Sequence, residues 1–479
     1  MLKQFTTDFR ELGKEKSLRY DVDFVDFQNE FLVERYYSFN DLFEFSFENK
    51  VDIEKLDDDF FYSEIGNVSK EGDVEPVKLN FGERRIEEEN YYKKIEKGNI
   101  IKARENDILL SKVRPNLRKF VFINEDTKNY FYTSAFVHLI PKKLNKILYY
   151  SFRTIFYENL IAISRQGKGY PTLKKDDFLY LKFDKKIIDK LTEKQDQIVA
   201  QIEPIEKKIK RLKAQITPPQ EIINKVFARE FGFDLEKFEE LKRIKNYYLD
   251  LFAFGNNKDI RQSVKFHRQA GVFVNQELKK VTNKKIKDFI SGPIVLGKGV
   301  SPKDFDENGD YFYISMANIK NWQFESEDSK LVFKEYSDKN QSKTVSKNDI
   351  LIARSGEGTI GKVALVDDED LRGIFADFTM RIRLKNYNSI FAYYYFRTEY
   401  FQYLVEVNKK GLGNNTNIFP SQIQEFPMID ISLEDQQKIV DEIKAELDKQ
   451  EEINKKIQTE RNEIDEIIEK AIKKRKKNK

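Results

Sequence analysis

The chain contains an internal sequence duplication. Residues 1 to about 237 recur, in diverged form, from about 243 to 479. The matched segments are 13–24 with 255–266, 107–109 with 349–351, 152–154 with 396–398 and 193–199 with 434–440, at shifts of 242, 242, 244 and 241 positions. Because the shift drifts by only a few residues, loops of similar length join the same elements in both copies. We therefore expect two copies of one fold that dock as a pseudo-dimer, an arrangement that suits a target with two similar halves.

The composition excludes several kinds of site. No cysteine occurs, which excludes disulfides, thiol nucleophiles and cysteine-bound metals. His138 and His267 occupy unrelated places in the two copies, so neither a zinc site nor a histidine acid/base pair is expected, while carboxylate-bound Mg²⁺ stays open. No stretch approaches the ~20 apolar residues of a membrane span, and the first ten residues lack the apolar core of a signal peptide. We expect a soluble, cytoplasmic protein with no membrane partner.

Each copy ends in a regular helical pattern. In the first copy, isoleucine and leucine recur at spacings of four and three, at Ile198, Ile202, Ile205, Ile209, Leu212 and Ile216. The second copy keeps a looser version, interrupted by Gln450 and Glu460, at Ile439, Ile443, Ile453, Ile457 and Ile464. This spacing is typical of a coiled-coil seam. Because a long polar helix cannot bury its apolar stripe alone, we expect the two helices to pack antiparallel across a pseudo-twofold axis.

Mixed α/β (α+β) blocks lie between these helical regions. Short alternating patterns predict strands at 121–123, 137–140, 363–366 and 380–384, and helical spacing predicts helices at 147–160 and 391–407. The predicted domains are a first recognition block at 1–190, a central coiled-coil region at 191–232, a connector at 233–259, a second recognition block at 260–431 and a C-terminal coiled-coil region with a basic tail at 432–479. The blocks diverge most at 25–105 and 267–345, which favours two different partners or two different sequences.

Several loop-like windows carry no acidic residue, although about one residue in six of the chain is Asp or Glu. These windows are 108–124, 159–175 and 407–424, and a glycine-rich hairpin tip lies close to them at 354–362. Acid-free windows also arise by chance, but together they provide the Lys, Arg and Asn side chains that contact phosphates and base edges. The candidate DNA contacts are Arg114, Asn116, Arg118, Lys119, Lys168, Arg354, Lys362, Asn414 and Asn415. Tyr170 and Phe419 are candidates to stack on a base.

Evidence for catalysis in this chain is weak. Gly356, Gly358 and Gly361 have the spacing of a dinucleotide-binding loop, but the pattern that follows them is a strand where that loop requires a helix. No phosphate-binding GK[ST] loop and no Asn-Pro-Pro-aromatic tetrad occurs. We therefore predict no catalytic, cofactor-binding or metal-binding residue. Two alternatives to a DNA-binding protein stay open: a coiled-coil assembly protein that binds other proteins, and a self-sufficient methyltransferase or nuclease.

The whole chain resembles the specificity subunit of a type I restriction-modification system. The resemblance rests on two blocks that are each followed by a long helical region. It also rests on two sequence frames, residues 349–354 with Gly361 and Lys362, and residues 411–418 followed by Leu433, Glu434, Gln436, Ile439 and Val440. The first copy departs from these frames, because 114–118 replaces the glycine-rich tip and 167–173 carries no asparagine.

The resemblance implies a non-catalytic subunit with two target-recognition domains. These domains would bind the two halves of a split DNA sequence. The paired helices would hold them apart and dock two methyltransferase subunits, to which a restriction and translocase subunit can be added. S-adenosylmethionine, ATP and Mg²⁺ would be bound by those partners. The first helical pattern, 193–216, would span about 36 Å at about 1.5 Å per residue. One turn of DNA separates half-sites by a similar ~34–36 Å.

Overall fold

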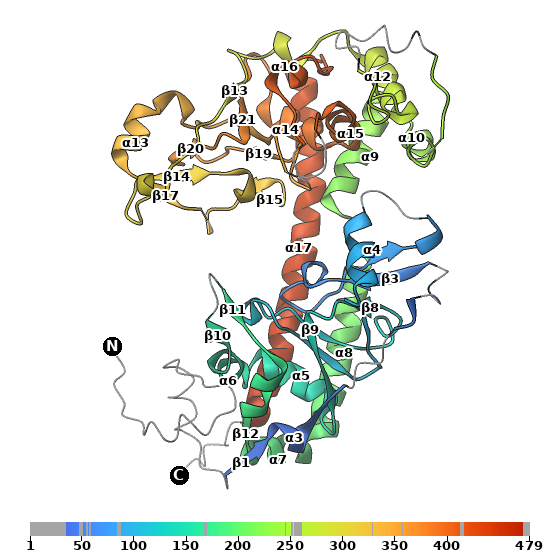
Figure 1. The fold of residues 1–479 in the computed structure, drawn as a ribbon, viewed down its shortest axis with the longest axis vertical. Helices are drawn as coiled ribbons and strands as arrows, with labels where there is room; N and C mark the ends of the chain where they lie inside the picture. The colour runs from blue at the N-terminus through green and yellow to red at the C-terminus, as the bar shows by residue number, and fades with distance from the viewer. Residues whose placement is uncertain are drawn as a thin grey trace. The chain divides into compact units, whose positions relative to one another are not determined.

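The computed structural model describes residues 35–46, 51–53, 56, 59–83, 88–166, 170–244, 246–250, 252, 261–327, 329–356, 358–411 and 416–472. The chain forms two compact units (Figure 1). Unit 1 contains Met1–Ala214 and Lys455–Lys479, and unit 2 contains Gln215–Asn454. Each unit thus combines a recognition block with helical segments. The domain boundaries predicted at 190, 232, 259 and 431 stay predictions.

Unit 1 is built on two small sheets. The first is antiparallel, in the order β2 (Phe43–Phe45), β9 (Phe136–Pro141), β6 (Ile108–Ser111) and β7 (Phe120–Phe122). The second has the order β4 (Val77–Leu79), β3 (Phe60–Ser63), β8 (Phe131–Tyr132) and β5 (Ile101–Lys102), with β3 and β8 parallel. All four residues of β6 are buried, as expected for a central strand whose two faces are both covered.

Unit 2 repeats this plan. Its main sheet has the order β13 (Val295–Leu296), β21 (Thr379–Ile382), β18 (Ile350–Ala353) and β19 (Val363–Leu365). A second sheet has the order β17 (Leu331–Val332), β14 (Tyr311–Ile314) and β20 (Gly373–Phe375), with β14 and β20 parallel. Helices α10 (Leu235–Lys242) and α12 (Gln269–Val281) add to this unit. The fold is mixed α/β with several small sheets, as predicted.

Fine details of the two units also match. Asp107 and Asp349 are both buried, and each accepts a 2.8 Å hydrogen bond from the backbone amide three residues earlier. The charge partner differs, however. His138 Nε2 lies 2.6 Å from the Asp107 carboxylate, whereas the Arg383 guanidinium donates two 2.7 Å bonds to Asp349. The frame of the fold is therefore duplicated, while the side chains around it have diverged.

The predicted strands are confirmed, and the two regions predicted to be helical inside the blocks are helical, but each is divided into two helices. The region 147–160 contains α5 (Asn145–Arg153) and α6 (Tyr157–Ala162), and the region 391–407 contains α14 (Ser389–Arg397) and α15 (Glu399–Asn408). Thr398 explains the second break. Its backbone is extended, and its side chain accepts a hydrogen bond from the Phe401 amide. This arrangement is an N-cap that starts a new helix.

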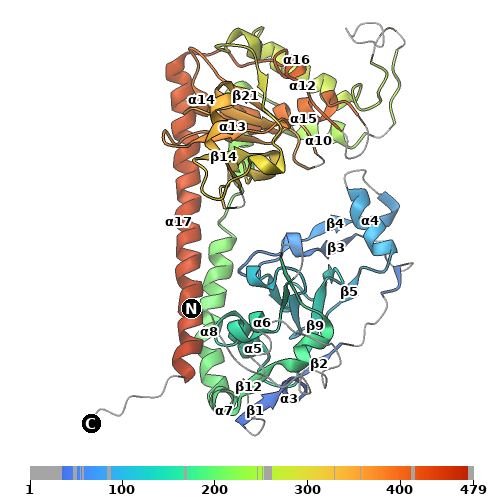
Figure 2. The ribbon, with the colours of Figure 1, turned by 60° about the vertical axis from the view of Figure 1, so that its left-hand side comes forward.

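Two helical segments pack antiparallel in unit 1. Helix α8 (Gln195–Lys213), which follows α7 (Lys185–Glu193), lies beside residues 455–472 of the long helix α17 (Leu433–Ile472), as both views show (Figures 1 and 2). The Lys194 ammonium bonds the Ala471 carbonyl at 3.2 Å, and Lys208 near the other end of α8 bonds Glu460 at 2.5 Å. Buried seam residues of this pair are Ile198, Ile202, Ile205, Ile209, Ile457 and Ile464.

Unit 2 contains a matching helical pair. Helix α9 (Pro219–Phe231) packs with residues 433–454 of α17, where Arg229 pairs with Glu442 at 2.5 Å. The Thr217 amide also donates a 2.9 Å hydrogen bond to the Gln450 side chain. Seam residues Ile439 and Ile443 are buried, and Ile453 is half-buried. The two polar interruptions of the seam, Gln450 and Glu460, therefore each bond a specific partner.

The length predicted for the first helix is wrong. The helical pattern 193–216 is broken at Lys194, and α8 ends at Lys213. Leu212 is half-buried in the last turn, and Ile216 lies beyond the end of the helix. The 19 residues of α8 span about 28 Å at about 1.5 Å per residue, instead of about 36 Å.

Candidate nucleic-acid interface

The two units have a matching position at the end of the central strand. In unit 1, the Leu173 amide donates a 2.8 Å hydrogen bond to the Lys112 carbonyl. In unit 2, the Ile418 amide donates a 2.9 Å hydrogen bond to the Arg354 carbonyl. Lys112 and Arg354 therefore occupy equivalent places, each held by a crossing segment that belongs to one of the acid-free windows. These segments bring several candidate DNA contacts to the same edge of each block.

Arg354 in unit 2 lies beside two exposed aromatic rings. Its guanidinium is 5.7 Å from the centre of the Phe378 ring and 5.5 Å from the centre of the Phe419 ring. Phe378 is 43% exposed and Phe419 is 38% exposed, so both rings are accessible to a ligand. We call these three residues the arginine clamp. Cation–π contacts of this kind hold a guanidinium in place without neutralising its charge.

The glycine-rich tip follows Arg354 directly. Gly356, Gly358 and Gly361 have φ values of 89°, 78° and 86°, a region that glycine enters without the steric cost of a Cβ atom. At Gly361 a Cβ atom would also lie only 2.8 Å from Gln402 Oε1. Strand β19 follows the tip, as predicted, where a dinucleotide-binding loop requires a helix. Lys362 at its end is half-buried, and no ion pair joins it to the described residues.

Unit 1 has a different tip. Arg114 and Arg118 flank a turn at Pro115–Leu117, and both have left-handed backbones, with φ values of 50° and 51°. The Arg114 guanidinium lies 5.1 Å from the centre of the Tyr170 ring, which is 41% exposed. The Arg114 amide donates a 2.9 Å bond to the Pro171 carbonyl, which brings the two windows together. Unit 1 thus also has an arginine on an exposed aromatic ring, on a different local backbone.

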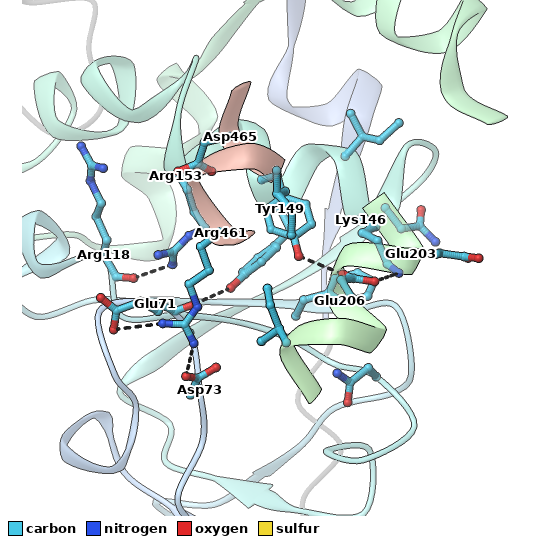
Figure 3. A pocket seen from close by; sticks show the side chains of 18 of the residues that line it. Glu71, Asp73, Arg118, Lys146, Tyr149, Arg153, Glu203, Glu206, Arg461 and Asp465 are labelled. Carbon is cyan, nitrogen blue, oxygen red and sulfur yellow. Dashed lines mark hydrogen bonds and ion pairs between the residues drawn. The ribbon is translucent and has the colours of Figure 1, made fainter. Parts of the chain in front are cut away.

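Arg118 and Asn116 lie apart from Arg114, in a cleft of about 1530 Å³ within unit 1 (Figure 3). The Arg118 guanidinium stacks 3.8 Å from the centre of the Tyr157 ring, and the Asn116 carbonyl accepts a 3.1 Å bond from the Tyr157 hydroxyl. Asp465 of α17 lines the same cleft. Burial raises the pKa of Asp465, although the positive charges of Arg153 and Arg118 oppose this. Arg118 therefore faces an acidic neighbour as well as solvent.

The remaining candidates divide into two groups. The Lys119 ammonium donates a 3.2 Å bond to the Ile65 carbonyl, and burial lowers the pKa of Lys119. That lysine is thus engaged within the block. Lys168, Asn414 and Asn415 lie outside the described residues. Sequence reasoning missed Phe378, whose only signal is its position in the turn between two strands.

No metal or membrane site is found in the part of the chain that the structure describes. It contains no cluster of three or more histidine or carboxylate side chains that could hold a metal ion. None of its helices is long and apolar enough to cross a membrane. The candidate interface offers arginine and lysine side chains, which suit phosphates and base edges.

A family model described as "Type I restriction modification DNA specificity domain" matches residues 266–463. This match covers most of the second predicted block and most of α17. No curated protein matches the sequence.

Several solved structures are similar over most of their length. One, titled as the structural basis of complex assembly and conformational transition of the type I R-M system, has 13% identity and a TM-score of 0.37, covering 92% of this chain and 97% of that chain. The HsdS subunit from Thermoanaerobacter tengcongensis has 13% identity and a TM-score of 0.29, with coverages of 91% and 96%. The type I S subunit from M. genitalium has 11% identity and a TM-score of 0.35, with coverages of 92% and 96%. The chain therefore contains a type I restriction modification DNA specificity domain at residues 266–463.

Proposed function

We propose that this chain is a DNA specificity subunit of a type I restriction-modification system, that it binds a bipartite DNA site with one half-site on each unit, and that it has no catalytic activity of its own. One observation carries the proposal. At the same edge of each duplicated block, an arginine lies against an exposed aromatic ring, Arg114 on Tyr170 in unit 1 and Arg354 on Phe378 and Phe419 in unit 2. Arginine and aromatic side chains together suit the charged backbone and the flat bases of nucleic acid.

These two arginines differ from those that hold the fold together. Arg165 pairs with the fully buried Asp177 at 2.6 Å, and Arg383 pairs with Asp349. Among the described residues, no carboxylate pairs with Arg114 or Arg354. Their positive charge therefore remains available to an anionic partner, and DNA is the anionic partner that fits a specificity domain.

The helical pairs are the proposed docking surface for two methyltransferase subunits, and a restriction and translocase subunit would join that complex. In α8 and α17 the buried seam faces the partner helix, while many of the other positions are exposed and carry charged side chains. The exposed positions that do not contact the first block are the proposed contacts for other proteins. S-adenosylmethionine, ATP and Mg²⁺ would bind in those partner subunits. The chain would then determine which DNA sequence the complex modifies.

The test is to purify the chain with the methyltransferase encoded beside it, to measure DNA binding at several salt concentrations and to map the methylated sites. We expect the logarithm of the affinity to fall steeply with the logarithm of salt, by about 0.9 for each phosphate contacted. We also expect one split sequence to be methylated. Salt-insensitive or absent DNA binding would favour the assembly-protein alternative. Methyl transfer or cleavage by the chain alone would favour a self-sufficient enzyme.

A further inference from the structure

We infer that Arg354 recognises a guanine in the half-site that unit 2 binds. This inference rests on the proposed function and deepens it, because it assigns a base and a residue to one position of an otherwise unknown target. The arginine clamp, Arg354 with Phe378 and Phe419, is the site.

The backbone of Arg354 is fixed on both sides. Its amide donates a 2.9 Å hydrogen bond to the Phe378 carbonyl, and its own carbonyl accepts a 2.9 Å bond from the Ile418 amide. The two hydrogen bonds therefore attach Arg354 to both segments that carry the clamp rings. With its backbone held and its guanidinium beside two rings, Arg354 loses little conformational freedom when it binds a ligand.

The guanidinium is not engaged by the protein. Its Nε atom is buried and has no hydrogen-bond partner, and none of the described residues accepts a hydrogen bond from its other nitrogens. An arginine placed only to stabilise the fold would be bonded, as Arg383 is to Asp349. A buried donor without a partner costs free energy. The fold therefore gains little from Arg354, and a ligand with suitable acceptors is the better explanation.

Comparison with unit 1 supports a role in recognition. The equivalent residue there is Lys112, whose ammonium donates a 2.7 Å bond to the Ser134 carbonyl. The hydrogen-bonding positions of Phe378 and Phe419 correspond to Ala135 and Lys174 in unit 1. The same backbone thus forms without any arginine clamp. The arginine clamp is thus present in unit 2 and absent from the equivalent described residues of unit 1. The two units are expected to bind different DNA sequences, and the clamp is one of the features that distinguish them.

A guanine fits the clamp better than a phosphate does. In the major groove, guanine presents two neighbouring acceptors, O6 and N7, that match the fork of a guanidinium, and this is the commonest specific contact of arginine with DNA. A phosphate also accepts two bonds from arginine. The exposed rings of Phe378 and Phe419, however, place apolar surface beside Arg354, which suits base edges and the thymine methyl group more than a hydrated phosphate.

The first test uses the unaltered complex with its methyltransferase. Each guanine of the mapped half-site is replaced in turn by 7-deazaguanine, which lacks the N7 acceptor. Because 7-deazaguanine keeps O6, only the bond to N7 is lost, and we expect one position in the half-site bound by unit 2 to lose affinity by about 10- to 150-fold, the range for one hydrogen bond to a charged group. Equal affinity at every guanine of that half-site would overturn the inference. This measurement does not depend on how any variant folds.

The second test compares Arg354→Ala and Arg354→Lys in the same complex, with Lys112→Ala as the matched control in unit 1. We expect both Arg354 variants to methylate sites in which that one guanine is replaced by other bases, because lysine cannot form the bidentate fork. Lys112→Ala should leave every position of both half-sites unchanged. A uniform loss of affinity for all sequences, with a salt slope reduced by about 1, would instead show a phosphate contact and refute the assignment. If the unaltered complex binds no DNA, the proposed function itself fails, which is a different result.

Discussion

Arg461 of helix α17 donates a hydrogen bond to the carboxylate of Asp73, which lies 388 positions earlier in the chain (Figure 3). Lys213, in the last turn of α8, bonds the other oxygen of the same carboxylate. Burial alone would raise the pKa of Asp73, but the positive charges of Lys213 and Arg461 hold it below its usual value. Asp73 of the first block is thereby bonded to both helices of the antiparallel pair, α8 and α17.

Replacing Asp73 with Asn should destabilise unit 1, because Lys213 and Arg461 would lose their shared counter-charge. The three side chains are 35%, 38% and 19% exposed, so the cost falls between that of an exposed pair and a buried one, at about 1–2 kcal/mol. Urea denaturation of the chain measures it. The matched control is Asp126→Asn. Asp126 bonds Lys210 of the same helix but is 57% exposed, and its loss should cost less than about 0.5 kcal/mol. Equal losses in the two variants would contradict this account.

The same carboxylate should make stability depend on pH. Its folded-state pKa is below the ordinary value of 3.8, so the ionised form is favoured in the folded protein. The stabilisation that ionised Asp73 gives to the folded protein is therefore complete above the ordinary pKa of 3.8. It is lost as the pH falls through the lower pKa of the folded state. We expect the melting temperature of the unaltered chain to fall more steeply below about pH 4 than that of Asp73→Asn. Parallel pH profiles would show that Asp73 is not the titrating group.

The helical seam offers a test of packing. Ile202 is fully buried in the seam of α8, so Ile202→Ala should destabilise the protein by about 2–5 kcal/mol through lost contacts and the cavity left behind. Leu212 belongs to the same sequence pattern but is half-buried in the last turn, and Leu212→Ala should cost less than half as much. Urea denaturation again provides the measurement. A larger loss at Leu212 would mean that the seam continues past the observed end of α8.

Arg114 should contact DNA phosphate or base edges, whereas Lys119 should not. Arg114→Ala is expected to weaken DNA binding and to reduce the salt slope by about 0.9 if one phosphate contact is lost. Lys119 already donates to the Ile65 carbonyl, so Lys119→Ala should leave the slope unchanged. Arg114→Lys keeps the charge and should retain the slope. Binding measured in the methyltransferase complex at several salt concentrations distinguishes these outcomes, and an unchanged slope in Arg114→Ala would remove that residue from the interface.

The helical regions are expected to set the spacer between the half-sites. Adding four residues in register to both helices, α8 and α17, lengthens each by about 6 Å. At about 3.4 Å per base pair, the unrecognised spacer should then widen by one or two base pairs. Methylation mapping of the lengthened complex provides the readout. An unchanged spacer would show that the helices do not set the distance.

The sequence by itself determined the duplication, the mixed α/β blocks, the apolar seam and the glycine-rich tip beside Arg354. These features depend on spacing along the chain, because periodic burial and positive-φ turns are local properties. The end of α8 at Lys213 was not predictable in this way. The pattern continues to Ile216, so spacing alone gives no stop signal there.

Only the tertiary structure decided which cationic residues remain available to a ligand. Lys119 and Lys112 lie in the same acid-free window as Arg114, yet backbone carbonyls at Ile65 and Ser134 engage their ammonium groups. Phe378 joins Arg354 only because two neighbouring strands bring them together. Such partners lie far apart in the sequence, and the periodicity of one chain carries no information about which distant groups will meet.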